Sequence, residues 1–235
     1  MGETQPGKWP VIREAGFDGL LVSFGERLGE PANRAALAFR VAVEAARIGG
    51  VSETSTSLVS VYLRFDPLNH DHPAMRAELE ALLSERDWYA ACLPEGRRLW
   101  RIPTVYGGDQ LAQTARAAGM SADEAVKQLS ATQVRVQTIG FMPGMPYLGE
   151  LPEAWDIPRQ TELTAEVPKG GLCVAIRQLV LFPVATPTGW RQIGQTDFEL
   201  FRPESAEPFV LRAGDEAVFE AVDELGAAAT CEEIT

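Results

Sequence analysis

Proline and glycine interrupt the second half of the chain every few residues, and this pattern restricts the folds available to it. From residue 133 onward, turn residues bound the apolar segments, which lie at 134–136, 172–182, 198–201, 209–211 and 217–222. Many short strands with regular turns are typical of a barrel, whereas a parallel sheet needs longer crossover connections. We therefore predict a closed or nearly closed β-barrel in this half.

The first hundred residues predict a separate small domain. The expected elements are a strand at 20–24, a helix at 31–48, an extended stretch from 51, a strand at 59–65, a helix from 73 and a strand at 99–105. Pro at the start of each helix and alternating side chains in the strands favour these assignments. Their order is the split βαβ arrangement of ferredoxin-like domains. We predict an α+β fold with domains at 1–103 and 104–235.

Residues 109–129 predict two short helices, the second opened by a capping box at Ser121 to Glu124. The turn between them also resembles a helix-turn-helix. A recognition helix needs side chains that reach phosphates and base edges, but the second helix offers Asp123, Glu124 and one lysine, Lys127. A helical pair that packs on a neighbouring sheet fits this sequence better.

The charge balance disfavours nucleic acid and membrane surfaces as partners. The 235 residues include 33 Asp and Glu against 21 Lys and Arg, a formal net charge of −12. The long-range field therefore repels phosphate backbones and anionic lipid. The sequence also has no apolar stretch long enough to cross a bilayer and no secretory signal pattern at its start, so we expect a cytoplasmic protein.

Neither a metal site nor a disulfide framework is expected. The three cysteines, Cys92, Cys173 and Cys231, are far apart without metal-type spacing, and the two histidines, His70 and His72, lie in a loop-like segment. Cys173 falls in an apolar run, which predicts an inert buried thiol. The sequence contains no nucleophile elbow, phosphate-binding loop or dinucleotide fingerprint. No catalytic residue is therefore assigned. We expect the acidic tail at the end of the chain to fray.

Rigid turn residues surround aromatic side chains between residues 140 and 197. Because Pro and Gly fix the shape of a loop at low entropic cost, such loops can hold Tyr147, Arg159 and Trp190 in defined positions. Barrels also need tight corners, so each turn alone could be structural. Together they predict a shaped pocket for a small-molecule substrate.

The motifs in this region resemble a known family. They are G-F-M-P-G-M-P-Y-L-G at 140–149, I-P-R at 157–159, V-P-K-G at 167–170, T-P-T-G-W at 186–190 and I-G-Q-T at 193–196. In this order they resemble the family of the B-type subunit of 5-oxoprolinase, also called the Kip inhibitor (KipI) family or allophanate hydrolase subunit 1. The resemblance covers nearly the whole chain and is that of a divergent member.

The resemblance implies a ferredoxin-like domain followed by a cyclophilin-like β-barrel. It also implies a B-type subunit that works with a homologous C-type barrel subunit in a complex, which opens the lactam of 5-oxoproline to glutamate. Because an unstrained lactam resists opening, the complex would need ATP. No cofactor is expected on this chain alone.

The resemblance places the substrate groove along these loops. The expected lining residues are Phe141, Pro143, Gly144, Tyr147, Arg159, Gln178, Thr186, Trp190 and Thr196. Arg159 would pair with an anion, Gln178 would donate a hydrogen bond to a carbonyl group, and Tyr147 and Trp190 would form apolar walls.

The chain departs from the family at several polar positions. Leu129 stands where relatives carry His, Gln195 replaces an Arg, and Leu179 and Val180 replace part of a Gly-rich segment. These replacements predict a more apolar groove. Two alternatives therefore stay open: a divergent homologue that acts on another, apolar metabolite, or a regulatory binder such as the histidine-kinase inhibitor in this family.

Overall fold

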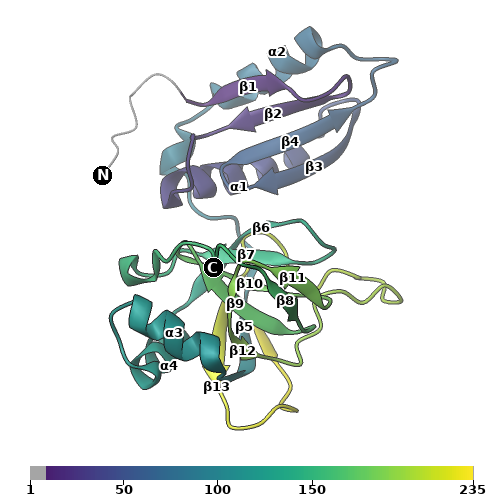
Figure 1. The fold of residues 1–235 in the computed structure, drawn as a ribbon. Helices are drawn as coiled ribbons and strands as arrows, with labels where there is room; N and C mark the ends of the chain where they lie inside the picture. The colour runs from purple at the N-terminus through teal and green to yellow at the C-terminus, as the bar shows by residue number, and fades with distance from the viewer. Residues whose placement is uncertain (1–8, 235) are drawn as a thin grey trace. The chain divides into compact units, whose positions relative to one another are not determined.

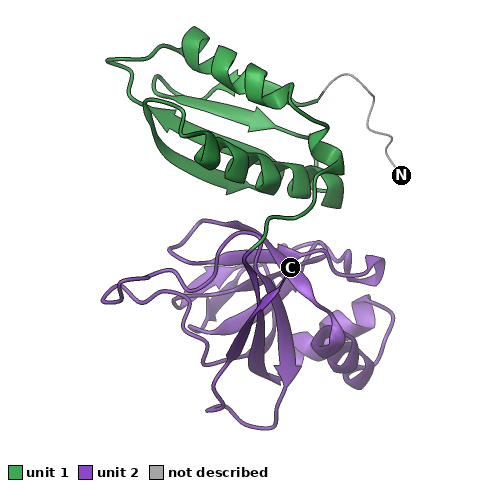
Figure 2. Cartoon of the chain, turned by 180° about the vertical axis from the view of Figure 1, so that it is seen from behind, with its two compact units in different colours: residues 1–95 green, residues 96–235 purple. Residues whose placement is uncertain are grey.

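The structure is a computed structural model that describes residues 9–234. The chain forms two compact units, residues 1–95 and residues 96–235, shown in separate colours in Figure 2. The predicted boundary after residue 103 falls inside a strand of the second unit, so the division lies eight residues earlier than expected, after residue 95. No helix within residues 9–234 has the length and apolar character needed to cross a bilayer.

The first unit is a four-stranded antiparallel sheet with both helices on one face (Figure 2). Its elements are β1 (Val11–Glu14), β2 (Gly19–Ser23), α1 (Glu30–Ala46), β3 (Val51–Ser57), β4 (Ser60–Phe65), α2 (His72–Leu83) and the short 3-10 turn η1 (Trp88–Ala90). The strand order is β1-β2-β4-β3, so β4 lies between β2 and β3. β2, α1 and β3, with β4 between the two strands, form the split βαβ motif that the sequence predicted.

One edge of this sheet differs from the prediction. The strand expected at 99–105 as the last strand of the small domain belongs instead to the barrel. The edge place beside β2 is taken by β1, which runs antiparallel to β2 with Val11 opposite Ser23. Four residues are too few to show a clear alternation of apolar and polar side chains, so the sequence analysis missed β1.

The second unit contains the barrel (Figure 1). Its elements are β5 (Arg97–Tyr106), α3 (Asp109–Ala117), α4 (Ala122–Ala131), β6 (Val134–Ile139), β7 (Pro146–Gly149), η2 (Glu153–Trp155), β8 (Thr164–Val167), β9 (Gly171–Ala175), β10 (Gln178–Leu181), β11 (Thr186–Thr188), β12 (Arg191–Gln195), β13 (Glu216–Ala221) and β14 (Thr230–Ile234). Among the described residues, seven strands follow one another in the order β12-β9-β10-β7-β6-β13-β5. The pairing of Gly194 with Tyr106 and Gln195 with Val105 closes the ring. The predicted α+β fold with a closed barrel is confirmed.

An inner core fills the barrel. Its strand residues are Ile102, Val134, Val136, Leu148, Leu172, Val174, Leu179, Leu181, Ile193, Ala217 and Phe219. Helices α3 and α4 pack against each other and against β12 and β13, and they add Leu111, Ala115, Ala125 and Leu129 to this core (Figure 1). The helical pair thus covers the barrel as predicted, and the capping box at Ser121 is present.

Three predicted segments differ in detail. The apolar run at 172–182 is a hairpin, because Ile176 and Arg177 adopt positive φ angles of 44° and 61° and reverse the chain between β9 and β10. The segments 198–201 and 209–211 pair as strands at one position only, Phe201 with Phe209, so neither forms a strand of several residues. The tail that was expected to fray forms β14, which pairs with the first half of β5.

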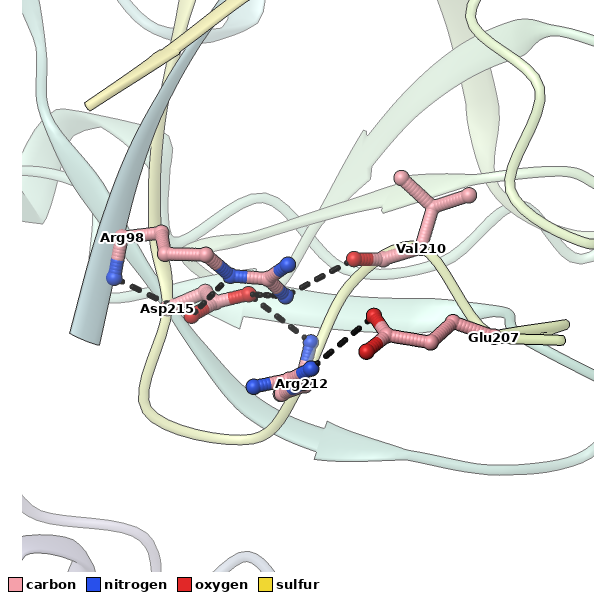
Figure 3. Close-up of polar contacts among 5 residues, drawn as sticks. All are labelled: Arg98, Glu207, Val210, Arg212 and Asp215. Atoms are coloured by element: carbon pink, nitrogen blue, oxygen red, sulfur yellow. Dashed lines mark hydrogen bonds and ion pairs between the residues drawn. The ribbon is translucent and has the colours of Figure 1, made fainter. Parts of the chain in front are cut away.

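A buried ion pair fastens the start of β5 to the segment before β13 (Figure 3). The Asp215 side chain is 2% exposed, and its Oδ2 lies 2.5 Å from Arg98 Nη2. The same carboxylate accepts hydrogen bonds from the backbone N–H groups of Arg98, at 3.1 Å, and Arg212, at 2.9 Å. The Arg98 guanidinium also donates to the Val210 carbonyl at 2.8 Å. One carboxylate thus fixes two segments that are far apart in sequence.

Replacing Asp215 with Ala should lower the free energy of unfolding of the second unit by about 3–5 kcal/mol, because the change leaves the Arg98 charge without its buried partner. The matched control is Glu207→Ala, which removes the exposed partner of Arg212 (Figure 3) and should cost far less. Denaturant unfolding of the full chain measures both changes. Equal losses for the two variants would contradict the structural importance of this pair.

Candidate functional site

The strands of the hairpin are apolar on both faces, and the outward face carries a second cluster. Inward side chains such as Leu172 and Leu179 belong to the inner core, so the alternate residues Cys173 and Val180 point out of the barrel. We call this second group the outer cluster; it contains Met145, Val167, Cys173, Ala175, Val180, Phe182 and Trp190, with Met142 and Tyr147 packed against it. Loops between the strands cover it.

Three of the predicted site residues meet at this cluster. The rings of Tyr147 and Trp190 are in edge-to-face contact with their centroids 6.0 Å apart. The Arg159 guanidinium carbon lies 4.9 Å from the centre of the Trp190 ring, a cation–π geometry. Trp190 is 5% exposed whereas Arg159 is exposed, so the cation covers the indole from the solvent side. The arrangement offers a positive charge beside an apolar wall.

Hydrogen bonds hold the Arg159 segment in place. The Gln160 backbone N–H donates to the Gly189 carbonyl at 2.7 Å, and the Gln160 side-chain amide donates to the Trp190 carbonyl at 3.1 Å. The Arg191 guanidinium donates to the Pro158 carbonyl. The I-P-R and T-P-T-G-W motifs are therefore joined directly, although about thirty residues separate them in the sequence.

The loop before β7 is closed by its own backbone. Gly140 donates to the Met145 carbonyl and Met145 donates to the Met142 carbonyl, both at 3.1 Å. Gly144 has a φ of +75°, and a Cβ there would lie 2.9 Å from the Leu200 carbonyl oxygen, so this position requires glycine. The two methionines pack onto the outer cluster.

Phe141 and Pro143 lie at the exposed tip of this loop. Both residues are exposed, and the Phe141 side chain is 77% accessible to solvent. The structure therefore places them at the rim and not inside the outer cluster. It is the methionines of the same motif, Met142 and Met145, that reach the cluster, and the sequence analysis did not select them.

The two threonines are placed separately. Thr186 lies opposite Val167 in the pairing of β11 with β8, so it is close to a member of the outer cluster. The Thr196 hydroxyl accepts a hydrogen bond from the Phe198 backbone N–H at 3.1 Å, and the Thr196 backbone N–H donates to the Gly170 carbonyl. These bonds fix a turn, so they assign Thr196 a structural task.

Gln178 extends the site along β10. It lies two residues before Val180 on the same face, and its side chain is 5% exposed. Its Nε2 donates to the Gln137 Oε1 at 2.8 Å. Gln137 was not predicted as a site residue, because a polar residue after Val136 continues the alternation of Val134, Arg135 and Val136 and does not stand out in the sequence.

Burial keeps two titratable groups of the second unit protonated. Burial raises the pKa of the Cys173 thiol far above its usual range, so the thiol stays protonated. Burial also raises the pKa of the Tyr106 hydroxyl, which donates to the Phe219 carbonyl at 2.9 Å. Both histidines of the chain belong to the first unit. No cluster of three metal-ligating side chains occurs in the described part of the chain.

Comparisons with known proteins show the family to which the chain belongs. Residues 10–211 match the family described as carboxyltransferase domain, subdomain C and D. The chain belongs to this family. It is 29% identical over 223 residues to a Bacillus subtilis protein named as the B-type subunit of 5-oxoprolinase, a match that covers 91% of this chain and 93% of that protein. An Escherichia coli O157:H7 protein of the same name is 40% identical over 147 residues, which cover 60% of this chain and 67% of that protein.

A solved structure agrees with this assignment. The crystal structure titled TTHA0988 superposes with a TM-score of 0.73 at 30% sequence identity. The match covers 91% of this chain but 40% of the other, so this chain spans less than half of that protein. The family assignment made from the sequence motifs is confirmed.

The positions of these residues in the structure show which departures from the family pattern can affect the groove. Leu129, where the resemblance led us to expect a His, lies in α4 within the inner core, and Leu179 also points inward. Of the apolar replacements considered, Val180 faces the outer cluster. The Gln195 amide donates to the Lys169 carbonyl at 2.6 Å and fixes a turn. The expectation that Leu129 and Leu179 make the groove more apolar is therefore wrong.

Iodoacetamide should modify the exposed Cys92 and Cys231 in the folded protein and should reach Cys173 only after unfolding. The thiolate is the reacting form, and a raised pKa keeps the Cys173 thiol protonated at about pH 8 while its burial blocks access. Mass spectrometry of the labelled peptides measures each site. Modification of native Cys173 at the rate of Cys92 would show that the outer cluster is open.

Proposed function

We propose that this chain is the B-type subunit of an ATP-dependent complex that hydrolyses a lactam, with 5-oxoproline as the substrate and a homologous C-type barrel subunit as the partner. The observation that carries the proposal is the match to the 5-oxoprolinase relative from Bacillus subtilis over 91% of this chain and 93% of that protein. A match of this extent leaves no large part of either protein unaccounted for.

The outer cluster supports this assignment through its chemistry. The substrate 5-oxoproline has a carboxylate on a small, largely apolar ring. Arg159 offers a cation for the carboxylate, and the half-buried Tyr147 beside Trp190 offers an aromatic surface for the ring. Gln178 offers a carboxamide to the lactam group. These residues bind and orient the substrate in the proposal.

The reaction defines the chemical steps that the complex must supply. Opening the lactam breaks the ring C–N bond, adds water across it and hydrolyses ATP to ADP and phosphate. The water must lose a proton and the leaving nitrogen must gain one. The second unit has no histidine, and the buried Cys173 thiol and Tyr106 hydroxyl stay protonated. The proposal assigns proton transfer and ATP binding to the other subunits.

Co-expression of this chain with the C-type subunit and the third subunit should give a stable complex that forms glutamate and ADP from 5-oxoproline, ATP and water. Arg159→Ala should raise the KM for 5-oxoproline about 10- to 100-fold, because a charge-assisted hydrogen bond contributes about 1.5–3 kcal/mol. The matched control is Arg212→Ala, which removes an exposed arginine in the same unit. Steady-state assays of glutamate formation measure both effects.

Two results would contradict these predictions, and each rejects a different claim. A purified complex that opens no lactam would overturn the proposed function. Normal turnover with an unchanged KM in Arg159→Ala would keep the function and remove Arg159 from the binding site.

A further inference from the structure

A bulge in β6 turns Gln137 onto the outside of the barrel. Val136 pairs with Leu148 and Thr138 pairs with Tyr147, so the register shifts by one residue at Gln137. Val136 belongs to the inner core. Gln137 is 3% exposed. The bulge thus buries a carboxamide next to the strand that carries Tyr147.

Glycine on the neighbouring strand makes room for this carboxamide. A Cβ on Gly149 would lie 2.8 Å from Gln137 Oε1 and 3.2 Å from Gln137 Nε2. The Gln137 amide therefore lies directly over the bare Cα of Gly149. Gly149 is two residues from Tyr147 on the same strand, so this space is on the outward face.

The next strand completes the row. Gln178 pairs with Gly149, and Val180 pairs with Tyr147. The two glutamine side chains therefore occupy the row of positions next to that of Tyr147 and Val180, at the border of the outer cluster. Gln178 Nε2 donates to Gln137 Oε1 at 2.8 Å.

This hydrogen bond sets the orientation of the Gln178 amide. With Nε2 directed at Gln137, the carbonyl oxygen Oε1 of Gln178 points the other way. Among the described residues, this oxygen has no hydrogen-bond partner, and it is not one of the fully buried polar atoms without partners. The site therefore presents a hydrogen-bond acceptor, whereas the sequence analysis expected Gln178 to act as a donor.

We propose that Gln137 is a positioning residue that holds Gln178 with its carbonyl oxygen toward the ligand, so that the site selects cyclic amides with a free ring N–H. The inference rests on the proposed function and names the group of the substrate, the ring N–H, that the site recognises. A lactam N–H donates to the Gln178 oxygen. A ring of the same shape without the N–H leaves that oxygen desolvated and unpaired.

The test compares two ligands on the intact complex without ATP, so that no turnover occurs. The probes are L-5-oxoproline and 3-oxocyclopentane-1-carboxylate, in which CH₂ replaces the ring N–H. Isothermal titration calorimetry should show about 10- to 100-fold weaker binding of the ketone, as expected for an unpaired polar group of about 1–3 kcal/mol. Equal affinities would overturn the inference.

Variants separate positioning from general structural support. In Gln137→Met and in Gln178→Met, the difference between the two ligands should fall below about threefold, and adding Gln137→Met to Gln178→Met should change nothing further. Gln113→Met, a matched change at an exposed site on α3, should keep the full difference. Full discrimination in Gln137→Met would overturn the positioning role.

A measurement on the unmodified chain covers the case in which Gln137→Met does not fold. The side-chain amide hydrogens of Gln178 should be protected from solvent exchange in NMR spectra, because Gln137 and burial hold them; fast exchange would overturn the positioning role. Failure of the wild-type complex to bind either probe would also overturn this inference. If that complex still turns over 5-oxoproline, the proposed function stands alone.

Discussion

The closure of the barrel on β5 is the constraint on which the second unit depends. This one strand pairs in parallel with β13 along one edge, while its other edge pairs with β14 near its start and with β12 near its end. Without the contact to β12, both β5 and β12 would expose unpaired backbone groups. The buried carboxylate of Asp215 binds the Arg98 side chain and backbone at the start of β5. Closure and this ion pair together fix the strands whose outward faces carry the candidate site.

Closure also explains why the candidate site is on the outside. Buried apolar side chains from all seven strands and from α3 and α4 make up the inner core, which is typical of a small barrel whose interior is packed with side chains. A site must then be built on the outer wall from loops that cover it. Loops contribute the exposed arginine above Trp190 and the methionines before β7, and the outer faces of β6 and β10 contribute the paired carboxamides.

The sequence predicted the features that local patterns encode, such as turns and loops. It did not predict which strands pair with one another. Turn residues predicted the barrel and the meeting of Tyr147, Arg159 and Trp190, because Pro and Gly restrict loops wherever they occur. The partner of a strand is not encoded locally, so the strand at 99–105 was placed in the wrong unit. The sequence also did not predict that the Leu129 side chain points into the inner core, because family motifs do not show which way a side chain points. Gln137 depends on a bulge, which no periodicity shows.

The two-sided apolar character of the β9–β10 hairpin has a consequence for how the chain must fold. From Gly171 to Phe182 the sequence contains a single charged residue, Arg177 at the turn. In an incompletely folded chain, this segment would present two apolar faces, which is the composition of strands that self-associate. The loops that build the candidate site also shield one of these faces. Evolution of that site is therefore constrained by solubility as well as by recognition, and changes in its loops put the whole protein at risk of aggregation.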